Sequence, residues 1–185
     1  DELLSAFDSE SMMGTWELVL YISQNYDITI DWSLEIESDL SNASEPPYFG
    51  PDYTGSQISS STSGVTVGTV EITDVGTITD INVTVDLSSS DALALNYLSI
   101  TLQSPYGTSV VLGAGSSVSG SPYWVGDDGS SLYNTIFDDE ASSSIYDGTP
   151  PFIGSFTPDE LLSAFDSESI TGTWKLVLYT GENHN

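Results

Sequence analysis

The chain has 185 residues, of which 28 are acidic, one is a lysine and none is an arginine, so its formal net charge is −27. Such a charge excludes a nucleic-acid binder, because nothing could neutralise phosphates, and it argues against docking on an anionic membrane. The absence of cysteine excludes disulfides and thiolate chemistry, and a lone histidine, His184, disfavours catalysis by a placed imidazole.

The two ends of the chain share a repeated segment. Residues 1–21 read DELLSAFDSESMMGTWELVLY and residues 159–179 read DELLSAFDSESITGTWKLVLY, so 18 of 21 positions are identical at an offset of 158 residues. Convergence on a common strand pattern would preserve apolarity but not the polar stretch DSES. The identity therefore indicates a recent tandem duplication, and the differences are Met12/Ile170, Met13/Thr171 and Glu17/Lys175.

The first copy continues into YISQNYDITIDWSLEIES, in which apolar and polar residues alternate. This period of two predicts a β-strand with one face in a core, and its inward side chains are Ile28, Ile30, Trp32, Leu34 and Ile36. The second copy continues only as TGENHN, where that strand should begin. We therefore assign residues 1–38 to the C-terminal strands of a preceding unit.

Residues 39–64 hold three of the eight prolines together with many Ser and Gly residues, which predicts a linker. Residues 65–185 then predict an all-β unit that lacks its final strand. A long alternating stretch is followed by LNYLSITLQSPYGTSVVL, which predicts a hairpin whose turn uses Pro and Gly. GTWKLVLY predicts a last strand, and DELLSAF predicts at most one or two helical turns.

The order of motifs ITDINVTVDL, LSITLQSPYGTSVVL, NTIFDDEA and PFIGSFTPDELLSAFDSESITGTW resembles the P domain of proprotein convertases and bacterial secreted proteases. The closing Trp-x-Leu strand of that family resembles Ile30–Ile36. The resemblance implies a jelly-roll-like β-sandwich of about eight strands that is not itself an enzyme and that stabilises a subtilisin-like catalytic domain. Here the neighbour of the module is another copy of itself, which favours a spacer or fibre instead.

Two acidic segments are candidates for a calcium site, as in P domains of bacterial proteases that bind this ion. Calcium prefers loop carboxylates and carbonyls, and the candidate ligands are Asp138, Asp139, Glu140, Asp166 and Glu168. The alternative interpretation is that Asp138 and Asp139 cap turns by accepting backbone N–H bonds. A further acidic loop, 126–129, is typical of a turn.

Three tryptophans, Trp16, Trp32 and Trp174, lie in strand patterns and are expected in the core. Trp124 stands in a loop-like sequence and is the one candidate for stacking on a sugar. Two Asn-x-Ser/Thr sequons mark Asn42 and Asn82 as candidate glycosylation sites.

These observations predict a structural, non-enzymatic repeat of an extracellular fibre, stalk or surface filament. Its expected partners are identical neighbouring units in a linear head-to-tail assembly, with glycans as a further partner class. No run approaches about 18 consecutive apolar residues, so no membrane insertion is expected. The units are either parts of one covalent tandem chain or subunits joined by strand donation.

Two other functions remain open. The chain could be the accessory P domain of a secreted protease, which a catalytic domain in the same polypeptide would support. It could also be a carbohydrate-binding or surface-binding adhesin module, which glycan binding through Trp124 would support.

Overall fold

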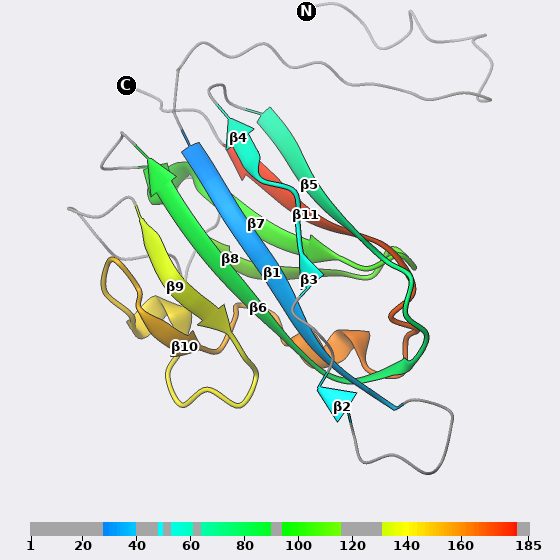
Figure 1. Ribbon diagram of the computed structural model, residues 1–185. Helices are drawn as coiled ribbons and strands as arrows, with labels where there is room; N and C mark the ends of the chain where they lie inside the picture. Colours follow the sequence, from blue (N-terminus) through cyan, green and yellow to red (C-terminus); the bar gives the residue numbers. More distant parts are fainter. Residues whose placement is uncertain are drawn as a thin grey trace, which may run out of the picture.

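The computed structural model describes residues 28–39, 48–49, 53–60, 64–89, 94–115 and 131–180. These residues form an all-β, sandwich-like arrangement of two sheets (Figure 1). The strands are β1 (Ile28–Asp39), β2 (Tyr48–Phe49), β3 (Tyr53–Thr54), β4 (Ile58–Ser60), β5 (Gly64–Ile72), β6 (Thr77–Ser89), β7 (Leu98–Gln103), β8 (Ser109–Ala114), β9 (Leu132–Phe137), β10 (Gly154–Phe156) and β11 (Gly172–Thr180). Three short 3-10 turns complete it: η2 (Ala94–Tyr97), η3 (Ile145–Asp147) and η4 (Leu162–Phe165).

The first sheet, sheet A, has seven strands in the order β10-β9-β6-β1-β2, and β3 and β4 also pair with β1. The second, sheet B, has four strands in the order β5-β11-β7-β8. Every pair is antiparallel except β9 with β10, which is parallel. Alternate residues of each long strand face the other sheet, so the core lies between the two layers.

The alternating stretch after the first repeat is a strand, as predicted. Each of its five inward side chains is at most 3% exposed, and these are Ile28, Ile30, Trp32, Leu34 and Ile36. On β11, Trp174 is fully buried against Phe165, with the ring centroids 5.2 Å apart in an edge-to-face arrangement. The Trp174 indole N–H donates to the carbonyl of Ile170 at 3.0 Å, which satisfies the polar atom inside the core.

The hairpin predicted around Ser-Pro-Tyr-Gly is also confirmed. Strands β7 and β8 pair from Gln103 with Ser109 onward. In the turn, the N–H of Gly107 donates to the carbonyl of Ser104 at 3.0 Å, and Gly107 has φ = +91°. This backbone region is accessible to glycine at low cost, which explains the residue found there. The segment DELLSAF forms only the short turn η4, as its sequence predicts.

The structure differs from the sequence-based division of the chain in the position of β1. This strand lies inside sheet A, where it pairs with β6 over nearly its whole length, from Ile28 opposite Ser89 to Asp39 opposite Thr77. The sandwich formed by residues 64–180 is thus completed by a strand from the same chain, whereas the sequence predicts that this strand belongs to a preceding unit. The physical reason is that the five apolar side chains of β1 fill the inner face of sheet A beside β6.

The sequence also predicts a linker over residues 39–64, whereas part of this segment is paired. Three short strands, β2, β3 and β4, run antiparallel along β1. Ile58 is 2% exposed and belongs to the core. A Ser-rich and Gly-rich composition therefore does not prevent pairing when a long strand supplies the partner backbone.

Candidate functional site

Carboxylates gather on the outer face of sheet A. Outward positions of β1 carry Asp31, Glu35, Glu37 and Asp39, and outward positions of β6 carry Asp80 and Asp86. The register sets Asp31 directly opposite Asp86 and Glu37 opposite Asp80. Like charges in direct cross-strand positions repel each other, so this face costs stability in the folded state.

Nearby donors offset part of that cost. The Gln57 side-chain amide donates to Asp31 at 2.8 Å, and the backbone N–H of Asn134 donates to Asp86 at 2.6 Å. A shallow depression of about 360 Å³ lies beside these groups. Its lining residues are Thr29, Asp31, Asp86, Leu87, Ser88, Leu132, Tyr133 and Asn134. Ionised carboxylates accept hydrogen bonds only, so the depression favours cations or hydroxyl-rich ligands over anions.

The side chains of the predicted calcium ligands Asp138 and Asp139 accept hydrogen bonds from backbone N–H groups. Asp138 accepts the N–H of Glu140 at 2.8 Å in a local turn. Both oxygens of Asp139 accept backbone N–H groups at the start of η4, from Leu162 at 2.8 Å and from Ser163 at 2.9 Å. These contacts are those expected from the capping interpretation.

The loop that carries these residues is electrostatically coupled to sheet A. Burial raises the pKa of Asp80, and the charges of Asp138, Glu37 and Asp139 add to the increase. The hydrogen bond with Asp138 raises the pKa of Glu140, and the charge of Asp80 adds to it. Each group therefore binds its proton more readily in the folded protein than an isolated carboxyl group does.

The second acidic segment has different surroundings. Asp166 is exposed at the end of η4. Glu168 accepts a hydrogen bond from the Thr108 hydroxyl through Oε1, and its Oε2 is buried without a hydrogen-bond partner. Within the described residues, no group of three or more His, Asp or Glu side chains is placed to hold a metal ion. Calcium binding by these five residues stays a prediction.

The other predicted sites are placed in part. Asn82 lies half-buried on the outer side of β6 opposite Glu35, and its side-chain oxygen is buried without a hydrogen-bond partner. Asn42, Trp16, Trp124 and the loop 126–129 lie outside the described residues.

Sequence reasoning missed the opposed carboxylates of sheet A. The signal was present, because Asp31, Glu35 and Glu37 occupy polar positions of an alternating strand and so share one face. Their partners on β6 were not accessible from sequence, since they depend on which strand pairs with β1 and in what register.

Comparisons with protein-family models, curated proteins and solved structures found no match to this chain. Among the residues that the structure describes, no helix is long and apolar enough to cross a membrane.

Proposed function

We propose that this chain is a structural, non-enzymatic repeat of an extracellular fibre, stalk or surface filament, built from P-domain-like, jelly-roll-like sandwiches linked in tandem. The partners in this proposal are identical neighbouring units. The observation that carries it is the agreement between the sequence repeat and the extent of the folded unit.

Within the described residues, the sandwich runs from Ile28, the first residue of β1, to Thr180, the last residue of β11. At the 158-residue offset, the counterpart of Thr180 is Ile22. Only residues 23–27 therefore separate a copy of the β11 sequence from β1. A duplication with this period copies one whole sandwich and leaves a joint of five residues. A complete folded unit joined to the next by a short segment is the arrangement expected of a tandem structural repeat.

The polar groups described above support a structural role. The carboxylates of Asp31, Asp86 and Asp139 each accept a hydrogen bond that fixes another segment of the fold. Bonds of this kind hold segments of a fold together, which is the role that a scaffold requires of these carboxylates.

Calcium stabilisation is a further part of the proposal, because Glu37 lies opposite Asp80 and Asp31 opposite Asp86 on the outer face of sheet A. Burial is the main cause of the raised pKa of Asp80, and a bound cation would relieve the repulsion from neighbouring carboxylates that adds to it. Melting curves in calcium, in magnesium and in chelator test it. A rise in melting temperature specific to calcium supports the proposal, and identical curves contradict it.

The function itself is tested on native material. Gold-labelled antibodies against this chain should decorate filaments on the cell surface in negatively stained preparations. The mass of the denatured native polypeptide separates the two forms of assembly: several hundred kilodaltons indicates one covalent tandem chain, and a value near 19.7 kDa indicates separate subunits. A catalytic domain in the same polypeptide would instead favour the accessory role, and the absence of labelled filaments would contradict the proposal.

A further inference from the structure

The two outer faces of the sandwich differ sharply in charge. The outer face of sheet A carries six carboxylates and no cation on β1 and β6. On sheet B, the outward positions of β5 and β11 carry one acid, Glu71, and one base, Lys175, which is the only lysine of the chain. In a chain of net charge −27, two copies therefore approach with less repulsion across the outer face of sheet B than across that of sheet A.

This neutral face also carries an exposed apolar patch, which we call the β5–β11 patch. It consists of Val65, Val67, Val177 and Tyr179. Val65 is 66% exposed, Val67 45% and Tyr179 43%, and Val177 is partly exposed between them. The register sets Val65 opposite Tyr179 and Val67 opposite Val177, so the four side chains are contiguous.

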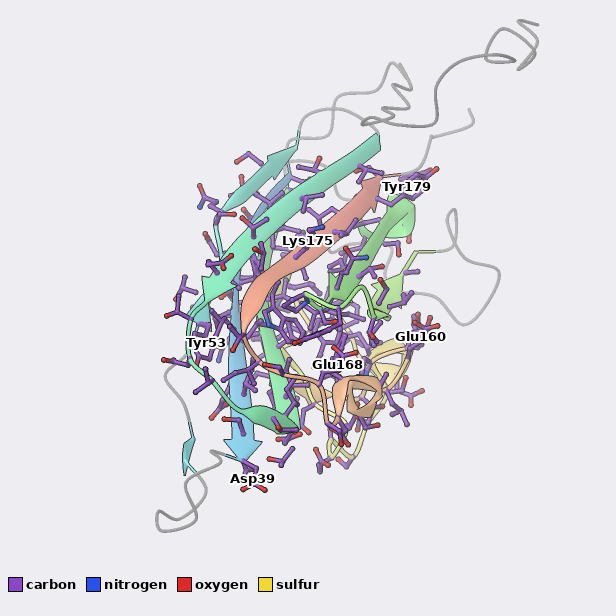
Figure 2. All side chains as sticks on the ribbon, turned by 90° about the vertical axis from the view of Figure 1, so that its right-hand side faces the viewer. Asp39, Tyr53, Glu160, Glu168, Lys175 and Tyr179 are labelled. Carbon is purple, nitrogen blue, oxygen red and sulfur yellow. The ribbon has the colours of Figure 1, made fainter. Side chains whose placement is uncertain are left out.

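The patch lies at the end of the sandwich where the repeats join. Strand β1 begins and strand β11 ends at the same end of the fold (Figure 1). Figure 2 shows Tyr179 near that end of β11, with Lys175 further along the same strand. Six Cα–Cα steps from Ile22 to Ile28 reach at most about 20 Å. A preceding copy folded like this one would therefore have its own patch near this joint.

The opposite edge of sheet B is closed. The N–H of Val111 on β8 donates to the side chain of Glu160 at 2.8 Å, and the N–H of Glu160 donates back to the carbonyl of Val111 at 3.0 Å. A partner strand cannot pair with β8 there without displacing these bonds. On β5, the N–H of Thr69 likewise donates to the Ser56 hydroxyl at 2.8 Å, and its carbonyl accepts the N–H of Ser56 at 2.9 Å. Strand pairing is thus opposed at both edges of sheet B, which favours contact between copies through its outer face.

We infer that the β5–β11 patch is the contact surface for a second copy of this domain, which packs side by side with the first across the outer faces of their B sheets. The inference rests on the proposed function, because it takes the neighbour to be another repeat. The contact is isologous, with the same patch used on both copies, so it pairs each repeat with one neighbour, while the joints between repeats continue the linear assembly. Four side chains make a small interface, and the five-residue joint compensates by keeping the local concentration of the neighbour high.

Cysteine trapping in the full chain tests this contact, and the chain has no natural cysteine to interfere. Val65→Cys places a thiol in the patch. Val75→Cys is the matched control, because Val75 is 68% exposed and follows the opposite end of β5. Under mild oxidation at millimolar protein, Val65→Cys should give several-fold more disulfide-linked dimer than Val75→Cys. Added salt should increase the yield, because it screens repulsion between acidic chains.

A second variant shows whether the patch is responsible. Tyr179→Ser in the Val65→Cys background should lower the dimer yield to that of the control, with an unchanged circular dichroism spectrum. Equal yields of disulfide-linked dimer from Val65→Cys and Val75→Cys would overturn the inference. An unchanged dimer yield after Tyr179→Ser would overturn it as well. Because filament labelling is a separate measurement, failed trapping with labelled filaments rejects only this contact, whereas trapping without filaments rejects the proposed function.

Discussion

The indole N–H of Trp32 on β1 donates a 3.0 Å hydrogen bond to the carbonyl of Ser56, and the neighbouring N–H of Gly55 donates to the carbonyl of Trp32 at 3.0 Å. The ring lies so close to this segment that a Cβ on Gly55 would come within 2.0 Å of it. The Trp32 side chain therefore adds to the backbone pairing that fastens residues 53–60 to β1. They also reach sheet B, where the N–H of Ser56 donates to the carbonyl of Thr69 at 2.9 Å.

This arrangement predicts that Trp32 is central to stability. Trp32→Ala removes a side chain that is 3% exposed and should lower the free energy of unfolding by about 3–5 kcal/mol. Trp32→Phe keeps most of the packing but leaves the Ser56 carbonyl without its donor, and should cost about 1–3 kcal/mol. Urea denaturation followed by fluorescence or circular dichroism measures both values.

The exposed Tyr133→Ala serves as the control for that comparison. Tyr133 is 64% exposed, so its removal should change the free energy of unfolding by no more than about 0.5 kcal/mol. A Trp32→Ala protein as stable as the Tyr133→Ala protein would show that β1 does not complete this sandwich in solution.

Asp139 provides a prediction that separates a structural carboxylate from a calcium ligand. Asp139→Ala leaves the N–H groups of Leu162 and Ser163 without their acceptor and should cost about 1–3 kcal/mol of unfolding free energy. Because this role needs no metal, the loss should be equal in calcium and in chelator. Asp166→Ala, at an exposed position, is the comparison. A loss confined to calcium-containing buffer would instead assign Asp139 to a metal site.

The raised pKa of Asp80 predicts a dependence of stability on pH. Its folded-state pKa lies above the ordinary value of 3.8, so the folded state binds this proton more tightly than the unfolded state. The contribution of Asp80 to the free energy of unfolding therefore increases as the pH falls from neutrality through the raised pKa toward 3.8. This contribution is lost again as the pH rises through the raised pKa. Asp80→Asn should be more stable than the parent at pH 7 and should gain less on acidification.

Denaturation midpoints at several pH values between neutrality and the ordinary Asp value test this prediction. Asp166→Asn removes one negative charge at an exposed site and shows the effect of net charge alone. If the Asp80→Asn and parent curves run parallel through this pH range, burial among carboxylates does not perturb Asp80.

The predictable part of the fold is the part encoded locally. Alternation identified the β1 strand and its inward face, and a Pro-Tyr-Gly sequence identified the turn between β7 and β8. The contacts of Asp139 with residues 162 and 163 bridge more than twenty positions, so no local pattern could separate the capping interpretation from the metal one. The strands within residues 48–60 were hidden for the same reason, because their backbone partners belong to β1.

The location of β1 was the hardest feature to predict, since a repeat with a period of 158 residues offers the same strand sequence once per unit. Sequence similarity to a closing strand favoured a neighbour as the source. In the structure, β1 pairs on one side with β6 and on the other with β3 and β4, which follow it directly in the chain. Pairing with a following segment closes short loops and has a low entropic cost.

The distribution of charge predicts that salt stabilises this protein. The folded state holds Asp31 opposite Asp86 and Glu37 opposite Asp80, and compaction brings many further carboxylates closer than they are in the unfolded chain. The Debye length falls from about 30 Å at 0.01 M to about 3 Å at 1 M ionic strength, so the melting temperature should rise over this range. Asp31→Asn, which keeps an oxygen acceptor for Gln57, should raise the melting temperature at low salt and flatten the salt dependence. Glu71→Gln, on the neutral face of sheet B, should produce a smaller rise in melting temperature and a smaller change in the salt dependence. A melting temperature that falls with added sodium chloride would show that attractive pairs, and not repulsion on sheet A, dominate the electrostatics of the fold.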